Sequence, residues 1–218
     1  DDNSNTNPLA LASPATASGI VVMNYSFGVG RFSALSLECC NASSVQSASI
    51  VAQSVSSGQT PDLIFTGRDS NSSNAERMRL NSQGHLTLPN APSFHAVGMS
   101  GSSYDNGTMT GSGSGPSHNI GNHYNGSTGI FTAPVAGRYL TGCGVLVQSG
   151  SGRLEGNISK NNSQTVANFN GTGTTYDGPV AVAIVNLAAN DTLRVKRQSG
   201  NAYDSNHGNH YFFAHLIG

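Results

Sequence analysis

The stretch that decides the fold runs from Asn119 to Tyr139 and reads NIGNHYNGSTGIFTAPVAGRY. Its spaced residues follow the pattern N-x4-Y-x6-F-x5-G-x-Y: Asn119, Tyr124, Phe131, Gly137 and Tyr139. Pro134 lacks a backbone donor and fixes φ, so it ends pairing at a sheet edge, and Gly137 tolerates the turn into the next strand. Phe131 and Tyr139 supply large apolar areas on either side of this bend. The stretch therefore predicts a bend before a long strand, flanked by buried aromatic side chains.

This spacing resembles the signature of the complement globular-head (C-one-q) domain, a jelly roll that this family shares with the tumour necrosis factor superfamily. Two later stretches are also similar to the family: Leu187–Leu193 resembles the turn before its penultimate strand, and Tyr211–Ile217 resembles its terminal strand. The resemblance covers residues 94–218. The chain has other residues at four positions, Gly113, Thr141 and Cys143 in place of aromatics and Ala214 in place of the usual Gly.

The composition favours strands and turns over helices. The chain has 218 residues, 27 of them Gly, no Trp, and long runs of Ser, Asn and Thr. Only 10% of the residues are charged and the formal net charge is −1, so the usual electrostatic basis for nucleic-acid binding is missing. No apolar run is long enough to cross a bilayer, and we expect no membrane insertion. The predicted fold class is all-β.

Three segments are distinguished along the chain. Residues 1–18 are polar and contain prolines, which predicts a linker or the end of a shaft. Residues 19–91 hold short apolar or alternating runs between Gly and Ser/Asn clusters, the pattern of a small β domain. Residues 92–218 predict a jelly-roll sandwich. Its expected strands are 94–98, 120–124, 129–131, 138–147, 153–160, 164–169, 180–187, 192–198 and 211–217.

Residues 75–89, AERMRLNSQGHLTLP, resemble a β-hairpin element found in tail-fibre proteins of tailed bacteriophages. Met78 and Leu80 alternate with two arginines, residues 81–84 supply the turn, and leucines return on the same face. The alternative is an ordinary two-stranded hairpin. Because a domain similar to the complement head follows it, we favour a fibre protein, whose small domain precedes a distal head.

The expected loops of the head differ between its two ends. If the strands from Arg138 onward run antiparallel, as the resemblance implies, the tight turns 161–163 and 188–191 lie at the stalk end. The long loops 99–118, 148–152, 170–178 and 199–209 then lie at the far end, where binding residues usually reside.

Three of these long loops carry a Tyr-Asp doublet. A ring beside a carboxylate can stack on a sugar and accept hydrogen bonds from its hydroxyls. The alternative is that the Asp residues only stabilise their bends. The candidate receptor-binding residues are Tyr104, Asp105, Tyr176, Asp177, Tyr203, Asp204 and His207.

No catalytic constellation is apparent, and we expect neither enzymatic activity nor a cofactor. The second domain has few carboxylates, and no nucleophile elbow, phosphate loop or Cys–His pair occurs. His207 and His210 could surround a metal ion only if three copies met at an axis, so no metal is assigned. We expect His123 and His215 at packing or interface positions. The three cysteines are expected to be reduced structural thiols: Cys39, Cys40 and Cys143.

Residues 180–185 and 211–213 are apolar on both sides of their strands, which indicates that something besides the opposite sheet covers them. We therefore expect a homotrimer, the assembly that the resemblance implies. The leading hypothesis is the distal trimeric module of a phage tail fibre. It would sit on the virion, contact other virion proteins through its N-terminal side, and bind a glycan or protein receptor on the bacterial surface. The alternatives are a structural capsid fibre or decoration protein, a polysaccharide-degrading enzyme, and a secreted cellular protein.

Overall fold

The computed structural model describes residues 28–41, 44–56, 60–68, 74–98, 116–148, 152–174, 177–203 and 209–218. Every regular secondary-structure element within these ranges is a β-strand, which confirms the predicted all-β class. The described ranges contain no helix of the length and apolarity that a membrane crossing requires. The chain divides into two compact units, residues 1–89 and residues 90–218.

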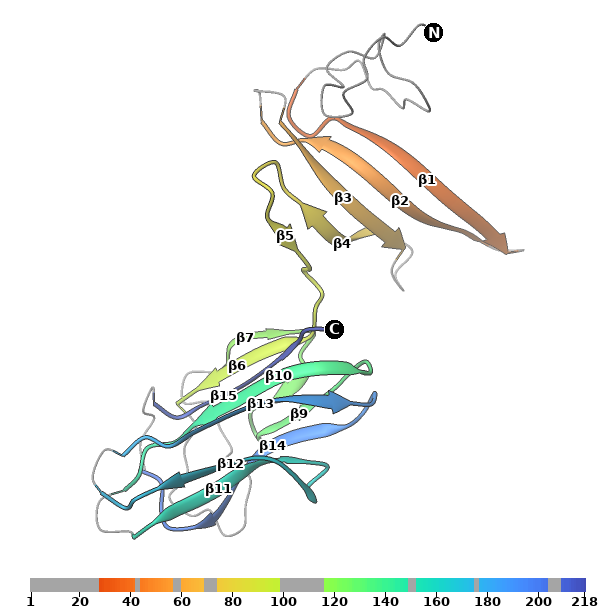
Figure 1. Ribbon diagram of the computed structural model, residues 1–218. Helices are drawn as coiled ribbons and strands as arrows, with labels where there is room; N and C mark the ends of the chain where they lie inside the picture. The colour runs from red at the N-terminus through yellow and green to blue at the C-terminus, as the bar shows by residue number, and fades with distance from the viewer. Residues whose placement is uncertain are drawn as a thin grey trace, which may run out of the picture. The chain divides into compact units, whose positions relative to one another are not determined.

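The first unit is one antiparallel sheet with the strand order β1-β2-β3-β4-β5 (Figure 1). Its strands are β1 Phe32–Asn41, β2 Ser44–Ser54, β3 Pro61–Arg68, β4 Asn74–Leu80 and β5 Leu86–Thr87. The predicted hairpin is present as β4 and β5, in which Arg79 pairs with Thr87 and Leu80 with Leu86. Because each strand pairs with the next one along the chain, the sheet is a simple meander.

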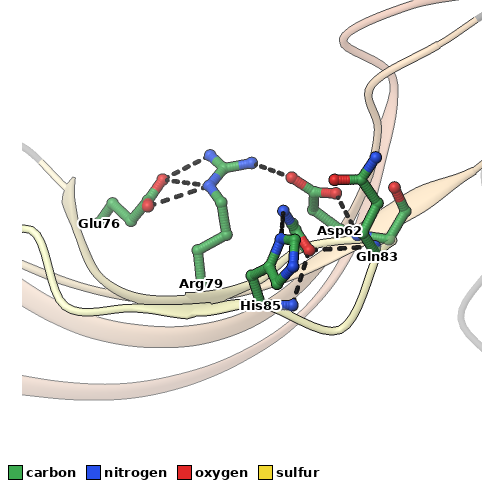
Figure 2. A network of polar contacts seen from close by, with 7 residues as sticks. Asp62, Glu76, Arg79, Gln83 and His85 are labelled. Atoms are coloured by element: carbon green, nitrogen blue, oxygen red, sulfur yellow. Dashed lines mark hydrogen bonds and ion pairs between the residues drawn. The ribbon is translucent and has the colours of Figure 1, made fainter.

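An ion-pair network lies on one face of this sheet. The Arg79 guanidinium donates to Asp62 Oδ2 at 2.6 Å and to Glu76 Oε2 at 2.5 Å, as Figure 2 shows. Asp62 Oδ1 accepts a further hydrogen bond from the Ser82 N–H at 2.9 Å. The bond from Arg79 holds the pKa of Asp62 below its usual range, with the Ser82 N–H acting in the same direction. The carboxylate therefore ties β3 to the hairpin turn.

The turn of the hairpin is closed by a side chain. Asn81 Oδ1 accepts from the N–H of Gln83 at 3.0 Å and from the N–H of His85 at 2.8 Å (Figure 2). The backbone of Asn81 also donates to the carbonyl of His85 at 2.9 Å. An Asn at this position replaces backbone partners that the turn removes, which fixes the register of the hairpin.

The second unit is the predicted jelly roll (Figure 1). One sheet has the order β13-β10-β15-β6-β7 and the other the order β12-β11-β14-β9-β8. The first contains β6 Ser93–Val97, β7 Pro116–Ile120, β10 Gly137–Gly144, β13 Val180–Leu187 and β15 Tyr211–Leu216. The second contains β8 Tyr124–Asn125, β9 Ile130–Thr132, β11 Leu154–Lys160, β12 Gln164–Gly171 and β14 Thr192–Ser199. After β10 the chain crosses to the second sheet for β11 and β12, returns to the first for β13, crosses again for β14 and returns for β15, which closes the sandwich.

The expected single strand 120–124 is wrong, because it is a turn between β7 and β8. Gly121 and Asn122 adopt positive φ angles of 77° and 57° there. Asn119 closes the turn: its Nδ2 donates to the Tyr124 carbonyl at 2.8 Å, and its Oδ1 accepts from the Tyr124 N–H at 3.1 Å. The side-chain amide thus acts as a strand partner for Tyr124, which explains the N-x4-Y spacing.

The aromatic residues of the motif meet in the core between the two sheets. Phe94 stacks on Tyr124 and Phe131, with ring centroids 4.3 and 5.1 Å apart, and Phe131 contacts Tyr139 edge-on at 5.7 Å. All four rings are buried. The Tyr139 hydroxyl donates to the Val135 carbonyl at 2.9 Å, which anchors the bend before β10. The predicted burial of aromatic residues on both sides of the bend is confirmed.

We expected a glycine at position 137 because of a turn, but Gly137 does not have a positive φ. A different reason therefore explains the glycine. A Cβ atom at Gly137 would lie 2.6 Å from Leu216 Cδ1 and 3.0 Å from the Gly218 carbonyl oxygen. The position therefore allows the last residues of the chain to approach β10 closely.

The cysteine of β10 is structural, as expected. Cys143 is a free, fully buried thiol, and burial raises its pKa to about 12. The thiol therefore stays protonated at neutral pH. Thr141, two residues earlier, is also fully buried and its hydroxyl donates to the Phe213 carbonyl at 2.8 Å. Cys39 and Cys40 belong to β1, but their side chains fall outside the description.

Candidate functional site

Two tight turns, residues 161–163 and 188–191, are joined by side chains. Asn161 Nδ2 donates to Asp191 Oδ1 at 2.7 Å, and Lys160 Nζ lies 2.7 Å from Asp191 Oδ2. The hydrogen bond from Asn161, assisted by Lys160, lowers the pKa of Asp191 to about 2. The carboxylate therefore holds the two turns together as an ionised group.

These turns lie at the end of the head where the chain enters. Leu187, the last residue of β13, pairs with Gly137, the first residue of β10. At this same end of β10, Tyr139 pairs with Leu216, whose N–H donates to the Pro92 carbonyl at 3.0 Å. The expected position of the tight turns is confirmed.

The opposite end, which we call the far end, is organised around residues 145–148. The expected strand 138–147 is too long: β10 ends at Gly144, because the residues that follow bond to loops on both sides. The backbone hydrogen bonds are Val145 N to Pro179 O (3.1 Å), Val147 N to Asp177 O (2.8 Å), Gln148 N to Asn201 O (2.9 Å) and Tyr203 N to Leu146 O (2.8 Å). Since residues 145–147 are at most 2% exposed, this segment is a buried support for the loops.

Two of the receptor-binding candidates, Asp177 and Tyr203, lie in the described residues, one on each side of this support. The other candidates fall outside the described residues: Tyr104, Asp105, Tyr176, Asp204 and His207. The structure therefore brings two of the candidate loops to the same end of the head, as expected. Receptor binding by any of these residues stays a prediction.

The Asp177 carboxylate is engaged within its own loop. Its Oδ2 accepts from the Thr172 N–H at 2.5 Å and from the Thr172 hydroxyl at 2.9 Å. The backbone bond first, and then the hydroxyl bond, lower the pKa of Asp177. This is the contact pattern of an Asp that stabilises a bend, so any contact to a receptor would be added to a structural role.

A polar cluster at the far end has no recognisable pattern in the sequence. Arg153 Nε lies 2.9 Å from Glu155 Oε1, and the Ser199 hydroxyl donates to Glu155 Oε2 at 3.2 Å. Arg197 Nη1 donates to Asn201 Oδ1 at 2.6 Å. Antiparallel pairing of β11 with β14 brings these residues together, with Glu155 opposite Ser199. Glu155 and Ser199 are 44 residues apart, so the sequence gives no local signal for their contact, which is why sequence reasoning missed the cluster.

The outer face of the β13-β10-β15-β6-β7 sheet is apolar. Val180, Val182 and Ile184 of β13 are 57%, 58% and 62% exposed, whereas the intervening Ala181 is 4% exposed and faces the core. Phe213 and Tyr211 cover two glycines of β10: a Cβ atom at Gly142 would lie 2.7 Å from the first ring, and one at Gly144 would lie 2.3 Å from the second. We call this surface the outer head face.

Histidines border the outer head face, and none is part of a metal site in the described residues. His95 and His118 are directly opposite each other on β6 and β7, with ring centroids 6.3 Å apart. Burial, and then the neighbouring His118, lower the pKa of His95. His215 is exposed on β15, and His210 is buried before it. No group of three metal-binding side chains occurs in the described ranges.

The head is similar to known proteins. A family model described as "C1q domain" matches residues 105–217. The globular domain of zebrafish complement 1qA protein is 17% identical, with a TM-score of 0.46, and the match covers 59% of this chain and 98% of that chain. Murine APRIL at pH 5.0 is 16% identical, with a TM-score of 0.47, over 58% of this chain and 99% of that chain. Eiger TNF from S. frugiperda is 12% identical, with a TM-score of 0.44, and the match covers 59% of this chain and 93% of that chain. No curated protein sequence matches the chain.

Proposed function

This chain belongs to the C1q domain family, and on that premise we propose that it is the distal, receptor-binding module of a trimeric fibre on a tailed-phage virion. C1q domains typically form trimers and are typically non-enzymatic. The module would be fixed to other virion proteins on its N-terminal side. Its far end would contact a glycan or protein on the bacterial surface.

The main observation in support of a trimer is the exposed apolar surface of the outer head face. Three large aliphatic side chains in a row on β13 are more than half exposed, next to the rings of Tyr211 and Phe213. Removing such a surface from water is favourable at about 25 cal/mol per Å², and contiguous apolar patches usually mark an interface. Two further copies are the cover that the family's usual assembly supplies.

The geometry of the loops supports a binding role for the far end. Tight, hydrogen-bonded turns occupy the end where the chain enters, and the longer loops are fixed to the buried support 145–148 at the opposite end. Loops on a rigid scaffold, held away from the point of attachment, are well placed to meet a receptor. The hairpin of residues 75–89, similar to an element of phage tail fibres, supports a virion location.

The assembly is tested by sedimentation of the wild-type chain at micromolar concentration. We expect a trimer, three times 22.4 kDa. Val182→Asp places a charge on the outer head face and should yield a monomer. Val135→Asp is the matched control, because Val135 is also exposed, at 45%, but lies in the bend before β10. A stable wild-type monomer would contradict the trimer.

Receptor binding is tested by competition. Excess purified trimer should block adsorption of the virus that carries it, and the monomeric Val182→Asp variant should block it less well because it loses multivalency. If the trimer does not compete, and if a virus without this gene remains infectious, the protein is instead a structural fibre or decoration protein. That second candidate is favoured only by the engagement of Asp177 within its own loop.

A further inference from the structure

The first unit also has an apolar sheet face, which its strand registers define. Residues directly opposite each other share a face of an antiparallel sheet. One row across the sheet is Leu35, Ile50, Phe65 and Met78, and a second is Ser33, Ala52, Leu63, Leu80 and Leu86. Leu37 lies on the same side two residues beyond Leu35. We call this surface the leucine face.

Among the described residues, none covers the leucine face. Its aliphatic side chains are well exposed: Leu35 50%, Leu37 68%, Ile50 42%, Leu63 38%, Leu80 39% and Leu86 59%. Neither row contains a charged residue. Arg77 stands at the rim beside a bulge, and its Nη2 donates to the carbonyl of Arg68 at 3.0 Å. The surface therefore offers contact area but almost no polar group that would select an unrelated partner.

The opposite face of the same sheet is mixed: one row across it holds Ala34, Val51 and Ile64, and Ile64 is only 5% exposed. This face also carries the Asp62–Arg79–Glu76 network and a hydrogen bond of 2.9 Å between the hydroxyls of Ser36 and Ser49. Because the aliphatic side chains of this row are partly or fully buried whereas those of the leucine face are exposed, the leucine face is the one that requires a cover.

The width of the face argues against a cover from the same chain. Five strands spaced about 4.8 Å apart span about 24 Å, whereas one additional strand covers only a fraction of that width. Sheets of equal size from the other copies offer enough area to cover it. If the heads form a trimer, the first units of three copies are tethered close together, at an effective concentration on the order of millimolar.

We infer that the leucine face packs against the leucine faces of the other copies, which gives the fibre a second self-association surface in addition to that of the head. This inference rests on the proposed head trimer. The first unit then obtains from its neighbours the second layer that the head builds for itself.

The test measures thiol reactivity in the full-length chain with Cys39 and Cys40 replaced by Ser. Leu86→Cys places a thiol on the leucine face, and Thr87→Cys is its matched control on the other side of the same strand, where the residue is also exposed. Leu35→Cys with Ser36→Cys repeats the pair at the other edge of the sheet. The buried Cys143 should not react. The probe is a maleimide under conditions where sedimentation reports the oligomeric state.

In the trimer we expect Leu86→Cys and Leu35→Cys to react at least tenfold more slowly than their controls. Adding Val182→Asp, which separates the heads, should bring each pair to similar rates. A trimer in which the leucine-face thiols react as fast as the controls overturns this inference alone. Thiols that stay slow in the Val182→Asp monomer overturn it as well, because the chain then covers its own face. A monomeric wild-type chain instead contradicts the head trimer on which the inference rests.

Discussion

The head and the first unit both contain a five-stranded antiparallel sheet with an apolar face, but they cover it differently. In the head, a second sheet closes over the face, so Phe131, Tyr139 and Phe212 are 0% exposed. In the first unit, Leu35 and Ile50 remain 50% and 42% exposed. The head therefore has its core within one chain, whereas the apolar face of the first unit stays exposed. The same strand pattern can specify a closed domain or half of an interface.

The strongest test of this difference removes a ring from the closed core. Phe131→Ala deletes a fully buried side chain that contacts Phe94 and Tyr139, and we expect a loss of about 3–5 kcal/mol in the free energy of unfolding. Calorimetry should show this as a lower melting temperature of the head.

The matched substitution in the open sheet is Leu35→Ala, which should destabilise a monomeric chain, such as the Val182→Asp variant, far less because Leu35 is half exposed there. Equal losses at the two positions would remove the distinction between a closed and an open core.

The second test breaks the turn of the motif. Asn119→Ala removes the side-chain amide that bonds to both the N–H and the carbonyl of the buried Tyr124. We expect the free energy of unfolding to fall by about 2 kcal/mol. Urea unfolding measures the effect. Asn170→Ala, at an exposed position of β12, is the control and should change the midpoint little. A loss no larger than that of the control would mean that β7 and β8 hold the turn unaided.

A smaller effect is expected at the bend before β10. Tyr139→Phe keeps the buried ring but removes the hydroxyl that donates to the Val135 carbonyl, and we expect a loss of about 1 kcal/mol in the free energy of unfolding. Comparison with Phe131→Ala separates the ring from its polar group. If the two variants lose equal stability, the anchoring of the bend matters as much as the core.

The smallest expected effect is on the stability of the head at acidic pH. The pKa of Asp191 falls from 3.8 to about 2 on folding, so its contribution is present above pH 3.8 and is lost as the pH falls towards 2. Asp191→Asn should flatten this part of the stability curve of the head, as measured by melting temperature between pH 5 and pH 2. The first unit has its own depressed carboxyl at Asp62, so its transition is a useful internal reference. An unchanged slope in the variant would exclude Asp191 as the source.

Several parts of the fold could be predicted because their signal is local. The hairpin of β4 and β5 follows from alternating residues and a polar turn, and the head follows from the N-x4-Y-x6-F-x5-G-x-Y spacing. The strand boundaries that were predicted wrongly depend on contacts with residues far away in the sequence. Residues 145–147 were predicted as a continuation of β10, but their backbone groups bond to loops at 177–179 and 201–203. The two motif departures in β10, Thr141 and Cys143, fit the core as small buried side chains.

The sequence by itself determined the class of the fold, the family signature, the aromatic core of the head and the ends at which turns and loops lie. These depend on alternation and spacing along the chain, which a linear pattern can carry. Only the tertiary structure decided which apolar strands are covered, that Gly137 admits the chain's last residues, and that Asp177 bonds within its loop. Burial, close approach and hydrogen bonding are properties of residues brought together by folding, so no stretch of sequence specifies them alone.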